Sequence, residues 1–378
     1  MTRKAVATIE AYFGDLPDPR IERGKRHQLI EIIVIAICAV ICGAENWPDV
    51  EAYGRTKTKW FKRFLKLENG IPSHDTFWRV FRRLDAEAFE QRFMAWVQAT
   101  VKLSAGEVVA IDGKTVRRSH DREAGRGPIQ LVSAWAEANQ LVLGQVKVKE
   151  GSNEVTAIPE LLEVLTLKGC IVTMDAAGCH EAFAETIVEK GGEYVLALKA
   201  NQARLYEEVK SLFAYAQETD FQDVEHDYSR STDKGHGRIE IRECWVIADP
   251  EYLAYVRERY DWRELKTIVM VVGQRRMADK TTTDVRYYVS SLPNDARLLL
   301  RAVRGHWSIE NSLHWVLDMV FREDESRLRQ DNGAHNFAIL RRIALNLLKQ
   351  EPTAKRSLRG KRLKAAWDDN YLLKVLLQ

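Results

Sequence analysis

Hydrophobic positions recur at helical spacing through the first 104 residues. Leu29 to Ile41 is a near-continuous apolar run, which predicts a buried helix. The longest apolar stretch, Ile32 to Ala44, is 13 residues long and therefore too short to span a bilayer. Further along, Ser73 is a good N-cap in front of apolar residues at helical spacing, from Phe77 to Leu84. We therefore expect residues 1–104 to form a helical region.

From Glu107 onward the pattern changes to short apolar runs typical of strands, separated by helical segments. The expected order is strand, strand, strand, helix, strand, helix, strand. The strands are expected at residues 108–111, 130–135, 141–148, 170–174 and 194–198, and the helices at residues 157–165 and 181–189. Asp112 ends the first strand and Asp175 ends the fourth. This order, with an Asp after both strands, is what the α/β fold of a ribonuclease H-like core requires, because open sheets carry reactive groups at strand ends.

The rest of the chain is arranged around this core, which we place at residues 105–200 and 294–350. Residues 201–293 are too many for a loop, and their strand-like pieces at 239–247, 267–272 and 285–290 predict an inserted, mainly β subdomain. A helix is expected at residues 297–321. Residues 351–378 are expected to be a basic C-terminal tail.

Composition narrows the class of protein only partly. Hydrophobic residues make up 46% of the chain and charged residues 29%, which excludes a disordered or fibrous chain. The net charge of +3 decides nothing, but basic residues gather among aromatic ones at residues 55–66 and 79–83. Basic helices of this kind are typical of DNA-binding regions, and a solvated charged surface is the alternative. Five Cys without a Cys-x-x-Cys pair argue against disulfides and four-thiolate zinc, and no signal peptide is readable, so we expect a cytoplasmic protein without a membrane segment.

The candidate chemistry lies in carboxylates. Asp112 and Asp175 each follow an apolar strand, and two such carboxylates on neighbouring strands can share divalent cations. The alternative is that each Asp only forms a turn. Glu310 lies at the border of the apolar stripe of the last core helix and would supply a third ligand. Its alternatives are an ordinary ion pair on the helix surface, or a zinc site in which His306 and His314 flank it at i−4 and i+4.

Three sequence blocks resemble those of bacterial insertion-sequence transposases with a DDE triad, in the branch that includes the H-repeat-associated proteins of Rhs elements. The blocks are Ala110-Ile111-Asp112-Gly113-Lys114, Thr173-Met174-Asp175-Ala176-Ala177-Gly178-Cys179 and residues 306–315, His-Trp-Ser-Ile-Glu-Asn-Ser-Leu-His-Trp. The resemblance extends from about residue 18 to residue 350. It departs from the wider family at the Tyr-Arg-Glu-Lys signature, where this chain has Val303, His306, Glu310 and Leu317. Ala177 and His180 also differ from the branch pattern, so an inactive remnant is one alternative.

The resemblance implies that Asp112, Asp175 and Glu310 bind two Mg²⁺ ions, with Mn²⁺ as a substitute, and that the protein cuts DNA at terminal inverted repeats and joins the ends to target DNA as a homodimer. Other residues are expected to contact DNA: Lys114 and Lys199 after strands, Asn201, His236 and Arg238 in the inserted segment, and His306, Trp307 and His314 beside the third carboxylate. Two rival functions remain. One is a metal-dependent nuclease that does not join ends, and the other is a DNA-binding protein without enzymatic activity.

Overall fold

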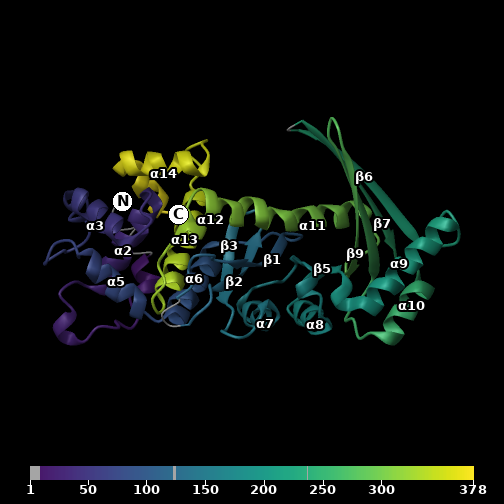
Figure 1. Ribbon diagram of the computed structural model, residues 1–378, viewed down its shortest axis with the longest axis horizontal. Helices are drawn as coiled ribbons and strands as arrows, with labels where there is room; N and C mark the ends of the chain where they lie inside the picture. The colour runs from purple at the N-terminus through teal and green to yellow at the C-terminus, as the bar shows by residue number, and fades with distance from the viewer. Residues whose placement is uncertain (1–8, 122–124, 236) are drawn as a thin grey trace.

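One nine-stranded sheet runs through the middle of the molecule, with helices on both faces and a group of helices at one end (Figure 1). The computed structural model describes residues 9–121, 125–235 and 237–378. The expected α/β character is confirmed: the structure is a mixed α/β protein with a large sheet. The sheet has the order β3-β2-β1-β4-β5-β9-β8-β7-β6.

The first five strands lie close to the expected positions. β1 pairs antiparallel with β2 and β2 with β3, whereas β4 and β5 run parallel to β1. β1 differs from the expectation because it continues beyond residue 111, where it keeps pairing with β2 as far as Thr115. The bounds are β1 (Val108–Thr115), β2 (Gln130–Ala136), β3 (Leu141–Lys147), β4 (Ile171–Met174) and β5 (Glu193–Leu198).

Helices cover the two faces of this part of the sheet. α7 (Glu154–Val164) and α8 (Glu181–Glu189) lie on one face, and the long helix α11 (Ala296–Ile309) crosses the other (Figure 1). At this crossing Gly305 lies directly against Val108 of β1. After Ile309 the helix widens into a π-helical segment, η4 (Glu310–His314), and continues as α12 (Trp315–Met319).

Strands from residues 201–293 extend the same sheet. β9 pairs antiparallel with β5, and β8, β7 and β6 follow it outward, so two long hairpins rise from one end of the molecule (Figure 1). Neither the strand β6 nor the helix α10 was expected. β6 escapes prediction because it is an exposed edge strand whose residues are nearly all polar. The bounds are α9 (Ala203–Glu218), β6 (His226–Gly235), β7 (Arg238–Ile247), α10 (Pro250–Arg259), β8 (Thr267–Arg276) and β9 (Thr281–Ser290).

The N-terminal helices pack around the end of the core. α2 is apolar on every side, and residues 32–41 are essentially inaccessible to solvent, so the helix lies inside the cluster. It ends at Gly43, whose φ of 118° gives the left-handed C-cap that glycine allows. The bounds are α2 (Leu29–Cys42), α3 (Trp47–Thr56), α4 (Thr58–Phe61), α5 (His74–Arg83) and α6 (Ala86–Thr100).

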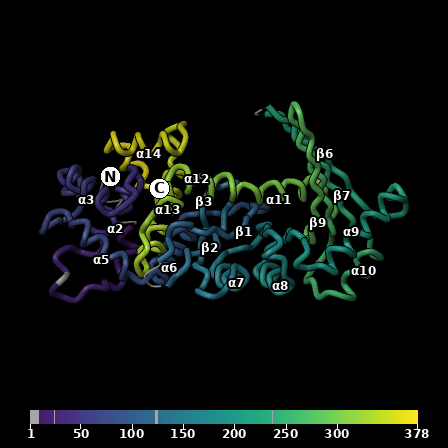
Figure 2. The backbone as a smooth tube through the Cα atoms, in the orientation of Figure 1, coloured from purple at the N-terminus to yellow at the C-terminus, as the bar shows by residue number. Residues whose placement is uncertain are grey.

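The C-terminal helices join the same cluster. α13 (Gly333–Gln350) is buried along most of its length and runs beside α2, α5 and α6 (Figure 2). Residues 351–378, expected as a basic tail, instead form the helices α14 (Leu358–Trp367) and α15 (Asp369–Leu376). They fold because apolar side chains such as Leu372 and Val375 are completely buried, while Arg362 reaches backbone carbonyls of α2.

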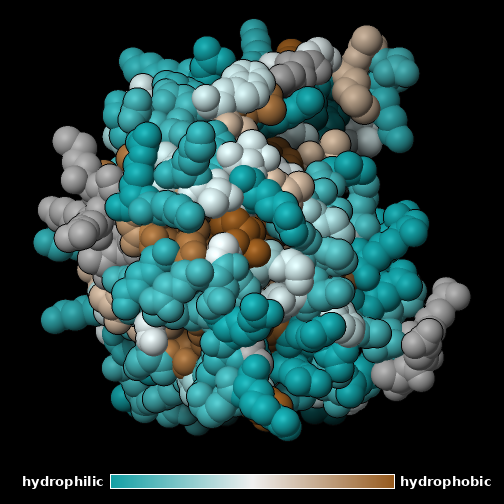
Figure 3. Space-filling view, turned by 90° about the vertical axis from the view of Figure 1, so that its left-hand side faces the viewer, coloured by the Kyte–Doolittle hydropathy of each residue, from teal (hydrophilic) through white to brown (hydrophobic). Residues whose placement is uncertain are grey.

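The surface of this helical end is mostly hydrophilic, with a small hydrophobic area recessed near the centre of the view (Figure 3). In the described part of the chain no single helix has both the length and the apolar composition to cross a membrane. The helices α2 and α3, which meet at 96°, have this length and this composition only when they are taken together as a bent pair.

Candidate active site

Asp112 lies inside β1, opposite Ser133 of β2. Its other neighbour, β4, ends at Met174, which pairs with Ile111. The Asp112 side chain is therefore next to the place where the parallel strand has stopped, and this end of β4 opens a crevice in the sheet. Asp112 was expected at the end of its own strand, but the end of the neighbouring strand is what makes it accessible.

Asp175 follows β4 directly, as expected from the sequence. One of its carboxylate oxygens accepts a hydrogen bond from the backbone N–H of Ala177 at 2.9 Å and caps the short helix η2 (Ala176–Gly178). The residue thus forms a turn and also stands at the crevice beside Asp112. For Asp175, forming a turn and contributing a carboxylate to a cation site were weighed as alternatives, and the two roles are compatible.

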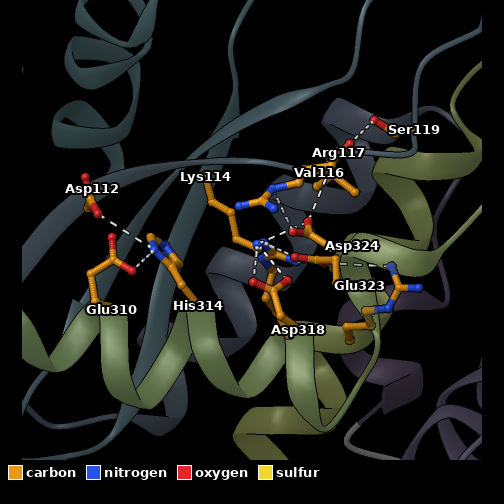
Figure 4. A network of polar contacts seen from close by, with 12 residues as sticks. Asp112, Lys114, Val116, Arg117, Ser119, Glu310, His314, Asp318, Glu323 and Asp324 are labelled. Carbon is orange, nitrogen blue, oxygen red and sulfur yellow. Dashed lines mark hydrogen bonds and ion pairs between the residues drawn. The ribbon is translucent and has the colours of Figure 1, made fainter.

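Glu310 begins the π-helical segment η4, at the point where α11 has crossed the sheet. Its side chain points toward Asp112, and the buried ring of His314 lies beside both carboxylates (Figure 4). The Nδ1 atom of His314 is 3.7 Å from Oδ2 of Asp112 and 3.5 Å from Oε2 of Glu310. Ligand atoms of these three residues lie within 4.8 Å of one another.

All three predicted carboxylates line one cavity of about 410 Å³. The pKa of Asp112 is raised to about 7, chiefly by burial and also by the charges of Glu310 and Asp175, against a backbone hydrogen bond that lowers it. The pKa of Glu310 is lowered, chiefly by its contact with His314. Carboxylate oxygens are the ligands that Mg²⁺ prefers, and a cation would relieve the repulsion within this group, so the residues present fit a divalent cation.

The alternative zinc arrangement, with two His residues around Glu310, does not form among the described residues. His314 faces Asp112 and Glu310, but His306 Nδ1 lies 3.1 Å from Oγ1 of Thr173 in β4 and is not part of the group that surrounds His314. His306 does line the 410 Å³ cavity, where burial lowers its pKa.

Lys114 is buried and already paired. Its ammonium group lies 2.7 Å from Asp318 and 3.4 Å from Asp324, and Arg117 also reaches Asp324 (Figure 4). Lys114 was expected to meet a DNA phosphate, but in the structure its positive charge is already balanced by two carboxylates. Instead, Lys114 ties β1 to α12 through Asp318 and to the segment that follows α12 through Asp324, and this holds the strand of Asp112 in place beside the helix of Glu310.

The other residues expected to contact DNA are spread along the cavity and beyond it. Lys199 is exposed at the cavity, and the amide of Asn201 donates to the backbone oxygen of Ala176. Trp307 is 45% exposed, and the guanidinium group of Arg286 lies 4.7 Å from the centre of its ring. Arg238 is exposed and paired with Glu240 at 2.7 Å. His236 lies outside the described residues.

A second cavity of about 710 Å³ continues from the first toward the hairpins. The two share Arg286, Trp307 and Glu310. Four further arginines line the second cavity: Arg238, Arg242, Arg275 and Arg304. Sequence reasoning did not single out Arg286, because it lies inside a strand-like run and only the pairing of β9 with β5 brings it to the active site.

A family model described as "Transposase DDE domain" matches residues 103–347, and its associated domain matches residues 10–97. The chain is 40% identical to "H repeat-associated putative transposase YhhI" of Escherichia coli K12, over 96% of this chain and 95% of that protein. It is 37% identical to "Putative transposase YncI" of Escherichia coli O157:H7, over 98% and 95%. A cryo-EM structure of a piggyBac transposase synaptic complex with hairpin DNA matches 99% of this chain and 78% of its own with a TM-score of 0.44 and 11% identity.

Proposed function

This chain belongs to the bacterial DDE transposases of the branch associated with Rhs elements, and we propose that it cuts DNA at the terminal inverted repeats of its insertion sequence and joins the ends to target DNA. The observation that carries the proposal is the convergence of Asp112, Asp175 and Glu310 on one cavity from β1, from the end of β4 and from the start of η4. The first and the last of these residues are almost two hundred positions apart in the sequence, and only the fold brings the three together.

Asp112, Asp175 and Glu310 would hold two Mg²⁺ ions, with Mn²⁺ as a substitute. When bound, such ions supply activation of the attacking hydroxyl and stabilisation of the departing oxygen. In the first step water attacks the phosphorus at the element end, the P–O3′ bond breaks, and a 3′-hydroxyl is freed. In the second step this hydroxyl attacks a target phosphodiester, a new P–O bond forms, and a target 3′-hydroxyl leaves. No covalent intermediate with the protein is needed.

The remaining parts of the chain would bind DNA. We assign residues 105–200 and 294–350 to a ribonuclease H-like core, residues 1–104 to a basic DNA-binding region and residues 201–293 to an inserted β-rich subdomain. The order and directions of β1 to β5 support the core, and the separate matches at residues 10–97 and 103–347 support the first boundary. Exposed basic side chains support the DNA-binding region: Lys59, Lys62, Arg63, Lys66, Arg79 and Arg83.

DNA would lie along the two connected cavities. Lys199 and Asn201 would meet the strand near the carboxylates, together with His306, Trp307 and His314. In support, Lys199, His306 and Trp307 line the cavity, and His314 lies beside Glu310. Arg238, at the hairpin of β6 and β7, would contact target DNA, and we propose the same role for His236, which lies outside the described residues. A homodimer assembled on two element ends in the cytoplasm, at the nucleoid, is the form in which we expect the protein to act.

The test is cleavage of a duplex that carries the terminal repeat, taken from the DNA that flanks the gene, with Mg²⁺ present. Asp112→Ala, Asp175→Ala and Glu310→Ala should each abolish cleavage and leave DNA binding intact, since they remove a metal ligand and no basic side chain. Zn²⁺ should not replace Mg²⁺. Cleavage at wild-type level by any of the three variants would remove that residue from the triad.

Joining of precleaved ends to a plasmid separates the rival functions. The transposase should join them, and Arg238→Ala should reduce joining more than nicking. Robust nicking without any joining would establish the nuclease, and repeat-specific binding without nicking would establish the DNA-binding remnant.

A further inference from the structure

A fourth carboxylate lies on the opposite face of β1 from Glu310. Glu154 is the first residue of α7, and its carboxyl group rests on the α-carbon of Gly113, next to Asp112. A Cβ atom at position 113 would lie 2.0 Å from Oε1 of Glu154 and 2.7 Å from Oε2. The φ angle of Gly113 is not in the left-handed region, so its backbone alone does not require glycine. A side chain at position 113 would instead displace the Glu154 carboxylate from this place.

This carboxylate lacks a protein partner. In the described part of the chain no hydrogen bond or ion pair reaches the side chain of Glu154, although the side chain is half-buried. A partly buried carboxylate without a partner is unfavourable unless something else compensates its charge.

A small cavity separates Glu154 from the predicted ligands. It is lined by Glu154, Asp112, Gly113 and Asp175 together with neighbouring apolar residues, and it measures about 10 Å³. This is close to the least volume that holds one water molecule. Asp112 and Asp175 line both this cavity and the large one that contains Glu310. The two aspartates therefore stand between Glu310 on one side and Glu154 on the other.

We infer that Glu154 is a fourth carboxylate of the cation site, which binds a divalent ion together with Asp112 and Asp175, and that residue 113 is glycine to admit it. The inference rests on the proposed function, because it assigns Glu154 to the same ions. Sequence analysis missed this residue because the expected helix began at residue 157. The competing explanation is local: an acidic residue in the first turn of a helix stabilises that helix through its dipole.

The experiment is a titration of the full-length protein with Mn²⁺, without DNA, in which the electron paramagnetic resonance signal of free Mn²⁺ gives the dissociation constant. Glu154→Gln keeps the size of the side chain and should weaken Mn²⁺ binding by about 10- to 100-fold. Gly113→Ala should weaken it similarly by displacing the carboxylate, and the double variant should bind no more weakly than Glu154→Gln alone. Glu163→Gln removes an exposed charge from the same helix and should leave Mn²⁺ affinity unchanged.

The outcomes separate the explanations. Wild-type Mn²⁺ affinity in Glu154→Gln overturns the inference. If that variant also has a lower melting temperature in chelator, the role of Glu154 is to stabilise its helix. In both cases loss of binding in Asp175→Asn leaves the proposed function standing. If the wild type and Asp175→Asn bind Mn²⁺ equally, both the inference and the cation site of the proposed function fail. Should Gly113→Ala not fold, Glu154→Gln still decides the question.

Discussion

Replacing Asp112 with Asn is expected to stabilise the metal-free protein while it abolishes activity. The Asp112 side chain is only 17% exposed and faces Glu310 and Asp175, and its pKa is raised to about 7. In the unfolded chain an Asp has a pKa of about 3.9. Because the folded protein holds the proton more tightly, ionising Asp112 at neutral pH destabilises the fold, and an amide of the same shape avoids this loss.

The magnitude follows from the two pKa values. A difference between about 7 and about 3.9 corresponds to about 4 kcal/mol of unfolding free energy at most. The favourable contribution of the protonated Asp112 is fully present below about pH 4 and is lost as the pH rises through about 7. The gain of the Asn variant should therefore be near zero at pH 4 and largest at pH 8. In a chain of this length, 4 kcal/mol corresponds to about 5 °C in melting temperature.

The assay is thermal unfolding in chelator at pH 4 and pH 8, repeated at pH 8 with saturating Mn²⁺. Mn²⁺ should raise the melting temperature of the wild type and leave that of Asp112→Asn nearly unchanged. Asp279→Asn, in the exposed turn between β8 and β9, is the matched control and should behave as wild type at both pH values. If Asp112→Asn is no more stable than the wild type at pH 8 in chelator, Asp112 is not a strained carboxylate and the electrostatic reasoning is wrong.

Three further predictions concern the frame of the site and its DNA surface. Glu323→Gln should lower the unfolding free energy in urea by about 3–5 kcal/mol, because it leaves the fully buried Arg342, now 2.6 Å from Glu323, without its counter-charge. Gly305→Ala should destabilise by about 1–3 kcal/mol and slow nicking at unchanged DNA affinity, because its Cβ would lie 3.0 Å from the Val108 side chain and force a small shift of α11 against β1. Lys62→Ala should reduce the slope of log affinity against log salt by about 1 on any DNA sequence; an unchanged slope would take this lysine off the DNA surface.

The elements that could be predicted are those whose sequence pattern has a single physical cause. Buried parallel strands need apolar runs, so β4 and β5 could be placed within a residue or two of their ends. Asp175 was found because a strand ending in a carboxylate is a local signal. Strand β6 gave no signal, since its pairing depends on β7 and its side chains are exposed and mostly polar.

The active site shows where local reasoning stops. A regular helix from residue 297 to 321 was expected, but the structure widens to a π-helix at Glu310, a feature that a period of 3.6 residues does not contain. Lys114 was expected to be a free cation because it follows a strand, and only the return of Asp318 and Asp324 from far along the chain shows that it is paired. Contacts of this kind depend on the fold and are absent from any window of sequence.

The chain leaves the catalytic strands after Leu198 and comes back directly beside the point of departure, where Tyr287 pairs with Leu198. The two ends of the segment between β5 and β9 are therefore always one strand spacing apart, however many residues the segment contains. Each doubling of such an excursion adds only about 0.6 kcal/mol of closure entropy. The hairpins between these two strands can thus be lengthened, trimmed or exchanged at this junction while β1 and β4 keep their register.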